Sequence, residues 1–271
     1  MRLQGLMQTE GQGRAPWRGI AVAMVLGGAS LLGACGSGGA GGTGGAAETN
    51  GAGRAADSAI AEDTLAGAVP RGAVTLGAVP RVVLLGTSLT AGLGLPPEQA
   101  YPNVLQEKAD SAGLAVRIVN AGLSGETSAG ALRRAGWVLD QPAAMVVLEV
   151  GANDGLRGVD PDSTYANLVK LVQAVKTRRP EAKLALVQME APTNLGQAYT
   201  RRFHDAYVRA AKETGVPLWP FLLEGVAGVA RLNQGDGIHP NAVGAQLVAA
   251  TMWRTMQPAI VDLTVARGQS P

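Results

Sequence analysis

The sequence predicts one three-layer α/β domain with a five-stranded parallel sheet, expected over residues 81–267 of the 271. Short apolar runs predict the strands, because none of them alternates polar and apolar residues, as is typical of strands covered on both faces. Segments with helical periodicity separate these runs. Strands that alternate with helices in this way favour a parallel sheet with right-handed crossovers.

The first predicted strand is Arg81–Gly86, a run of valine and leucine that ends at a glycine, and the others lie at 115–120, 144–150, 183–189 and 216–219. Between the strands, apolar residues recur at the i, i+3, i+4 and i+7 spacing of one helix face. This spacing is found at Leu132, Ala135 and Leu139; at Leu168, Leu171, Val172 and Val175; at Phe203, Tyr207 and Ala210; and at Val243, Leu247 and Ala250.

Residues 1–34 are expected to be a lipoprotein signal peptide, with a basic leader and then an uncharged, mostly apolar stretch at 20–34. That stretch is too short to span a bilayer comfortably as a helix. It ends in Leu32-Gly33-Ala34-Cys35, which resembles the lipobox of bacterial lipoproteins. The resemblance implies lipidation of Cys35 and an exported protein anchored at the cell envelope, on its periplasmic or extracellular face. The alternatives are an ordinary signal peptide with a chance cysteine and an uncleaved membrane anchor.

Residues 35–80 are expected to form a flexible tether. Nine of the eighteen residues 36–53 are glycine, and most of the others are alanine, serine or threonine. Such a segment buries too little apolar surface to offset the entropy of ordering. As a random coil, residues 36–80 would reach about 35–40 Å. A tethered catalytic domain and a tethered binding domain both fit this layout.

Composition disfavours several other functions. The formal net charge is +2, with scattered lysines and arginines and no basic stripe, so nucleic acid is not an expected partner. The single cysteine, Cys35, allows no intramolecular disulfide. Two separated histidines and that cysteine are too few ligands for a metal hydrolase. The few phenylalanines suggest no interface patch, so a monomer is expected.

Residues suited to acyl transfer follow the predicted strands, where open α/β sheets bind ligands. Ser88 follows the first strand, Gly125 the second and Asn153 the third, while Asp236 and His239 lie in the loop before the last helix. A serine needs a base, which His239 can supply, and Asp236 can hold the imidazole tautomer. The N–H groups of Ser88 and Gly125 and the Asn153 amide are candidate oxyanion donors. Each residue alone is also a common cap or turn former, but together they predict a serine hydrolase.

The segments Gly86-Thr87-Ser88-Leu89, Gly125, Gly151-Ala152-Asn153-Asp154 and Asp236-Gly237-Ile238-His239-Pro240 resemble the four blocks of the SGNH (GDSL) hydrolases. The similarity is greatest to the branch of acyl-CoA thioesterase I, lysophospholipase L1 and arylesterases, and covers about 81–258. It implies a flavodoxin-like sheet of order 2-1-3-4-5, a triad of Ser88, His239 and Asp236, and an oxyanion hole from Ser88, Gly125 and Asn153. It also implies substrate binding by Asp154, Gly155, Leu156 and Arg157, a small acyl ester, thioester or lysolipid as substrate, and no metal or organic cofactor.

One position departs from the family motif, which usually reads Gly-Asp-Ser-Leu. Thr87 keeps a hydrogen-bonding group there but carries no charge. An α/β-hydrolase is disfavoured, because Thr90 stands where its Gly-x-Ser-x-Gly motif needs the second glycine. Two alternatives stay open: a carbohydrate O-deacetylase, and a non-catalytic tethered envelope protein that has kept the fold.

Overall fold

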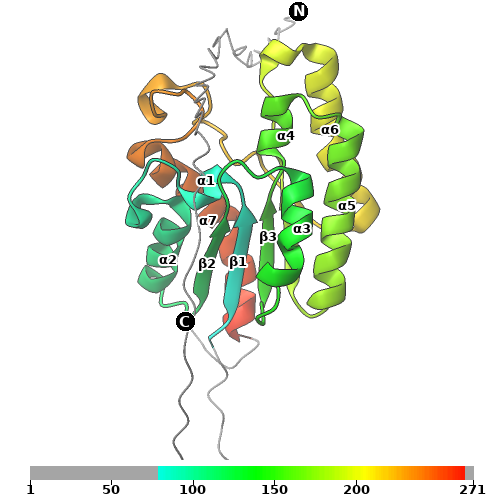
Figure 1. Ribbon diagram of the computed structural model, residues 1–271. Coiled ribbons are helices and arrows are strands. Elements are labelled where there is room, and N and C mark those ends of the chain that lie inside the picture. The colour runs from blue at the N-terminus through cyan, green and yellow to red at the C-terminus, as the bar shows by residue number, and fades with distance from the viewer. Residues whose placement is uncertain (1–78, 266–271) are drawn as a thin grey trace, which may run out of the picture. The chain divides into compact units, whose positions relative to one another are not determined.

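The computed structural model describes residues 79–265, which form an α/β unit with a five-stranded sheet (Figure 1). All neighbouring strands pair in parallel, in the order β2-β1-β3-β4-β5. The predicted fold class and strand order are confirmed. The predicted signal peptide, Cys35 and almost all of the predicted tether lie outside the described residues.

The strands are β1 (Arg81–Gly86), β2 (Arg117–Gly122), β3 (Met145–Glu149), β4 (Lys183–Val187) and β5 (Leu218–Trp219). The central strands β1 and β3 are buried along almost their whole length, as their unbroken apolar runs predict. Strand β2 begins later than predicted, because the pairing register starts with Arg81 opposite Arg117. Strand β5 is short, because it pairs only with Leu186 and Val187 at the edge of the sheet.

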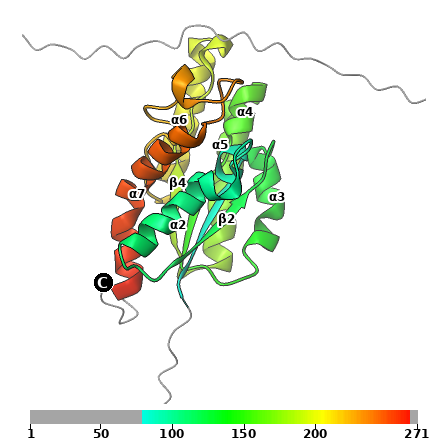
Figure 2. The ribbon, with the colours of Figure 1, turned by 90° about the vertical axis from the view of Figure 1, so that its left-hand side faces the viewer.

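Helices cover both faces of this sheet (Figures 1 and 2). Helices α2 (Tyr101–Ser111) and α7 (Ala242–Val265) pack against each other on one face, and α3 (Ser128–Val138), α5 (Pro161–Arg178) and α6 (Gln197–Thr214) pack side by side on the other. The short helices α1 (Ser88–Ala91) and α4 (Ala152–Arg157) directly follow β1 and β3. Three 3-10 turns complete the described elements: η1 (Pro97–Gln99), η2 (Thr193–Leu195) and η3 (Ala230–Leu232).

The predicted buried faces of α5 and α6 are confirmed, but the face predicted for α7 is wrong. Val243 and Leu247 are exposed, and the buried side instead carries Ala245, Val248, Ala249, Met252, Met256 and Ile260. Helix α7 is apolar on most sides, so periodicity alone cannot choose its orientation. Its rotation follows from a close approach, because a Cβ on Gly244 would lie 2.1 Å from the carbonyl oxygen of Leu232. Between residues 79 and 265, no helix is both long and apolar enough to cross a membrane.

Candidate active site

Ser88 lies at the carboxyl end of the central strand β1, as the first residue of α1. The Thr87 side chain caps this helix, and Gly92 ends it in the left-handed conformation with a φ of 77°. The turn is tight, because a Cβ on Gly86 would lie 2.1 Å from Thr90 Oγ1 and 2.6 Å from Glu149 Oε2. Only glycine fits at that position, so the strand can turn directly into the helix that presents Ser88.

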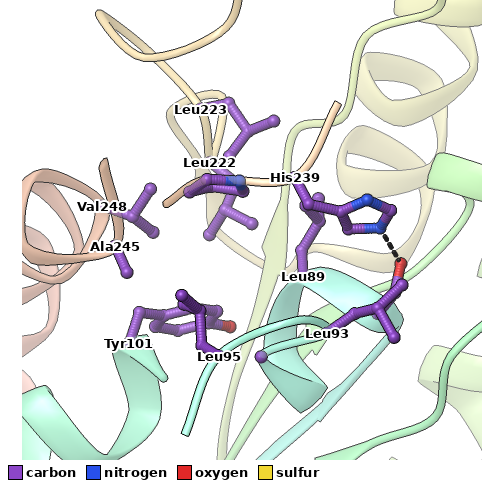
Figure 3. Close-up of a pocket in the computed structure, with 12 residues that line it drawn as sticks. Leu89, Leu93, Leu95, Tyr101, Leu222, Leu223, His239, Ala245 and Val248 are labelled. Carbon is purple, nitrogen blue, oxygen red and sulfur yellow. Dashed lines mark hydrogen bonds between the residues drawn. The ribbon is translucent and has the colours of Figure 1, made fainter. Parts of the chain in front are cut away.

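His239 and Asp236 meet Ser88 in a continuous chain of hydrogen bonds. The Nε2 atom of His239 is 2.8 Å from Ser88 Oγ, a contact drawn in Figure 3, and its Nδ1 atom is 2.6 Å from Asp236 Oδ2. With the proton on Nδ1, the ring donates to Asp236 and its Nε2 lone pair can accept the Ser88 proton. The structure therefore brings Ser88 next to the Asp236 and His239 pair, which follows it by about 150 residues in the sequence.

Asp236 is fixed by its own loop. Its Oδ1 atom accepts hydrogen bonds from the N–H groups of Ile238 at 2.9 Å and His239 at 3.0 Å. Partial burial raises the pKa of Asp236, but the hydrogen bonds from the His239 ring and from these two N–H groups outweigh it, so the pKa is lowered. Asp236 is therefore ionised at neutral pH and can stabilise a protonated His239.

The three predicted oxyanion donors follow β1, β2 and β3 in turn. The Asn153 amide donates one hydrogen bond to the carbonyl oxygen of Glu126 at 3.0 Å, which leaves its second hydrogen for a ligand. Gly125 has a φ of 77°, a conformation that favours glycine. Within residues 79–265, neither the Ser88 N–H nor the Gly125 N–H donates to another backbone group. All three donors thus keep a hydrogen to offer to a developing negative charge.

An ion pair connects the oxyanion loop to the sheet. Arg134 binds Glu126 at 2.6 Å, and both side chains are largely buried. The same guanidinium donates to the carbonyl oxygens of Gly86 at 3.2 Å and Ala121 at 2.8 Å. Arg134 therefore holds the ends of β1 and β2 and the residue after Gly125 in one arrangement.

The four residues predicted to bind substrate divide into two pairs. Asp154 is buried, and its carboxylate accepts hydrogen bonds from the N–H and hydroxyl of Ser128 and from Thr164. Gly155 packs against Phe203 and Ala191. The structure thus places Asp154 and Gly155 in the packing beneath the site rather than facing a substrate. Leu156 and Arg157 are exposed, and Arg157 donates to the carbonyl oxygen of Gly125 at 2.9 Å.

An apolar pocket opens beside Ser88 and His239 (Figure 3). Its volume is about 10 Å³, room for about one water-sized sphere. Besides Ser88 and His239, its lining includes Leu89, Leu93, Leu95, Tyr101, Leu222, Leu223, Ala245 and Val248. Most of this lining is not predicted from the sequence, although the apolar pair Leu222 and Leu223 lies shortly after the end of β5, where ligands of open α/β sheets bind. No group of three His, Cys, Asp or Glu side chains suited to a metal occurs in the described part of the chain.

Comparisons with known proteins agree with this geometry. Residues 84–247 match the GDSL-like Lipase/Acylhydrolase family. Over 184 residues the chain is 38% identical to Esterase TesA of Pseudomonas aeruginosa, covering 68% of this chain and 90% of that protein. It is 37% identical over 184 residues to Thioesterase 1/protease 1/lysophospholipase L1 of Escherichia coli K12, covering 68% of this chain and 86% of the relative.

A solved structure gives a further comparison. The psychrotrophic esterase EstA from Pseudoalteromonas sp., in a crystal structure described as inhibited by monoethylphosphonate, superposes with a TM-score of 0.63 at 33% sequence identity. The alignment covers 66% of this chain and 98% of that one. The region matched by the family, residues 84–247, contains Ser88, Asp236, His239 and the three predicted oxyanion donors.

Proposed function

The chain belongs to the GDSL-like lipase/acylhydrolase family and is a hydrolase of esters or thioesters, and we propose that it works through an acyl-enzyme on Ser88. The resemblance read from the sequence motifs is confirmed by these matches. One observation carries the proposed route: Ser88 Oγ, His239 and Asp236 form an unbroken hydrogen-bonded chain. A nucleophile, its base and the residue that orients the base are the parts that acyl transfer needs.

In the first half of the reaction, Ser88 Oγ attacks the acyl carbonyl carbon while His239 Nε2 takes the serine proton. Asp236 stabilises the imidazolium that forms. The N–H groups of Ser88 and Gly125 and the Asn153 amide receive the negative charge on the carbonyl oxygen, and each such donor is typically worth about 3 kcal/mol. The tetrahedral intermediate then collapses, and the leaving alcohol or thiol takes the proton from His239.

In the second half, His239 accepts a proton from water as that water attacks the acyl-enzyme. The ester bond to Ser88 breaks, His239 returns the proton to Ser88 Oγ, and the carboxylic acid is released. The apolar lining beside Ser88, which includes leucine, alanine and valine, favours a hydrocarbon acyl group, although the pocket of about 10 Å³ must open further to admit one. A non-catalytic role does not fit an assembled triad in a chain that belongs to a hydrolase family.

A lipid anchor on Cys35 is a separate part of the proposal. It is supported by the Leu32-Gly33-Ala34-Cys35 motif, which lies outside the described residues. Acylation of Cys35 would keep an exported domain at the membrane. We expect the wild-type protein to need detergent for extraction and Cys35→Ala to appear in the aqueous fraction. If both variants fractionate identically, the anchor is not on Cys35.

Hydrolysis of a short-chain p-nitrophenyl ester by the full-length protein tests the proposed route. Ser88→Ala should lower kcat by about 10⁴-fold or more. Equal turnover by wild type and Ser88→Ala would contradict the acyl-enzyme. The same two proteins are then compared on an acetylated polysaccharide. A clear preference for the polysaccharide over aryl and medium-chain esters would favour the carbohydrate deacetylase alternative.

A further inference from the structure

Glu149 is a fully buried carboxylate that the mechanism above does not use. It is the last residue of β3, lies opposite Gly86 of β1 in the sheet register, and has 0% of its surface exposed. A buried charge must be paired or hydrogen-bonded to be tolerated. The groups that hydrogen-bond Glu149 therefore indicate the role of this carboxylate.

Three donors from the residues around Ser88 converge on this carboxylate. The N–H of Thr87 donates to Oε2 at 2.8 Å, and the Thr87 hydroxyl lies 3.0 Å from Oε1 and 3.1 Å from Oε2. The Thr90 hydroxyl donates to Oε2 at 2.7 Å. Glu149 thus binds the chain on both sides of Ser88, at Thr87 and at Thr90. The Thr87 hydroxyl donates here, which the ionised aspartate usual at this position of the motif cannot do.

Among the described residues, no lysine, arginine or histidine forms an ion pair with Glu149. Tyr101 of α2 hydrogen-bonds Thr90 Oγ1 at 2.7 Å, and both this tyrosine and Tyr207 of α6 interact electrostatically with Glu149. Burial raises the pKa of both phenols, so both are neutral. The nearest guanidinium on α3, that of Arg134, binds the Gly86 carbonyl oxygen and is paired with Glu126. Above the turn, His239 contacts Ser88 and not Glu149.

We propose that the ionised Glu149 carboxylate is a positioning residue that holds Ser88 in register with His239 and the oxyanion donors. This inference rests on the proposed function. Helix α1 has four residues, too few to stabilise itself. Its geometry therefore depends on outside contacts, and Glu149 provides three of them. Protonation would convert one oxygen of the Glu149 carboxylate from an acceptor into an O–H donor. This donor would face the three donors of Thr87 and Thr90, so their hydrogen bonds to Glu149 would be weakened.

Burial raises the pKa of Glu149 to about 7, because the hydrogen bonds from Thr87 and Thr90 offset only part of the cost of desolvation. Glu149 therefore gains a proton in the range in which the enzyme is measured. Protonation of His239 also removes activity, because a protonated imidazole cannot act as the base. Two separate protonations should then lower the activity of the wild-type enzyme on the acid side.

The test is the pH profile of kcat/KM for full-length wild type and Glu149→Gln on a p-nitrophenyl ester. The amide has nearly the shape of the acid but cannot ionise. We expect kcat to fall by about tenfold or more, with KM changed by less than about threefold. On the acid side, log kcat/KM of wild type should fall with a slope steeper than about 1 over the interval in which Glu149 gains its proton, whereas the slope of the variant should stay at about 1. Glu213→Gln, an exposed change at the far end of α6, controls for the loss of a carboxylate and should keep the wild-type slope.

Two variants at Thr87 provide a second test that leaves Glu149 in place. Thr87→Val removes a donor to the carboxylate and should lower kcat, whereas Thr87→Ser keeps the hydroxyl and should recover most of the loss. If Glu149→Gln does not fold by circular dichroism, this pair decides the question. Equal kcat for Thr87→Val and Thr87→Ser, or a wild-type slope in folded Glu149→Gln, overturns the proposal. Failure of the proposed function has a different signature, because wild type would then hydrolyse no faster than Ser88→Ala.

Discussion

Ser88 and the Asp236–His239 pair, the two parts of the proposed triad, are held in place by different kinds of interaction. The nucleophile turn, residues 86–92, depends on partners distant in sequence, such as Glu149 and Arg134. The base loop, residues 233–240, is held largely by bonds within itself, from Asp236 to the N–H groups of Ile238 and His239. The Gln234 N–H adds a bond to the His239 carbonyl oxygen at 2.7 Å. One half is thus specified by tertiary packing and the other mainly by local sequence.

The carboxylates of the two regions differ in the same way. The Asp236 side chain is 45% exposed, so water shares in stabilising its charge. Glu149 is fully buried, and its charge is stabilised only by the hydroxyl and N–H groups around it. A change in the base loop should therefore act on chemistry with little effect on folding. A change beneath the nucleophile turn should act on both.

Removing the base should give the largest effect on activity. His239→Ala leaves Ser88 without a proton acceptor, and we expect kcat to fall by about 10⁴- to 10⁶-fold. Because the base loop keeps the bonds made by Asp236, the melting temperature should stay close to that of wild type. Steady-state kinetics and thermal melts of the same preparation measure both. A large loss of stability in His239→Ala would contradict the idea that the loop holds itself.

Removing the charge of the base loop should cost less. Asp236→Asn keeps an oxygen that can accept from the N–H groups of Ile238 and His239 but no longer stabilises the imidazolium. We expect kcat to fall by about 10²- to 10⁴-fold, with the fold unchanged. Kinetics with a p-nitrophenyl ester measure this effect. A loss below about threefold would mean that His239 needs no orienting carboxylate.

The charge beneath the nucleophile turn should appear as a pH-dependent stability. The pKa of Glu149 is raised from 4.5 to about 7, so the folded state binds more protons than the unfolded state in that interval. Its contribution to the free energy of unfolding is therefore highest at low pH and declines by about 3 kcal/mol as pH rises from 4.5 to 7.

Denaturant unfolding of wild type and Glu149→Gln at several pH values measures this contribution. The stability of wild type minus that of the variant should shrink as the pH rises through the interval and then level off. A constant difference from pH 4.5 to 7.5 would mean that Glu149 titrates alike in the folded and unfolded states. A shrinking difference would show that the charge beneath Ser88 is kept at a cost in stability, as is common at functional sites.

The smallest effect is expected at a side chain that joins the base loop to Leu93, the residue directly after the nucleophile turn. Gln234 donates to the Leu93 carbonyl oxygen at 2.7 Å and to the Pro240 carbonyl oxygen at 3.0 Å. Gln234→Ala removes both bonds, and we expect kcat/KM to fall by about two- to fivefold, near the free energy of one net hydrogen bond. Gln246→Ala, on an exposed position of α7, is the matched control. Equal kcat/KM for the two variants would show that the link does not position the base.

The contrast between the regions also explains what the sequence could predict. The strands and their order followed from buried apolar runs, and Asp236 and His239 stood out because they lie three residues apart in a glycine- and proline-bounded loop. The role of Glu149 could not be predicted, because in the sequence this residue only ends the apolar run of β3. The hydroxyl groups that bind it belong to residues about sixty positions earlier, so the contact is visible only in the folded chain. Asp154 was assigned to the substrate on resemblance, whereas its burial under Ser128 and Thr164 is visible only in three dimensions.

The most direct test of the acyl-enzyme is covalent capture of the nucleophile. Full-length protein is treated with an ethyl fluorophosphonate, and the intact mass and the modified peptide are determined by mass spectrometry. We expect one adduct per chain, on Ser88, complete loss of ester hydrolysis, and much slower labelling of His239→Ala. An enzyme that still hydrolyses the ester with Ser88 unmodified, or an adduct on another residue that tracks the loss of activity, would contradict it.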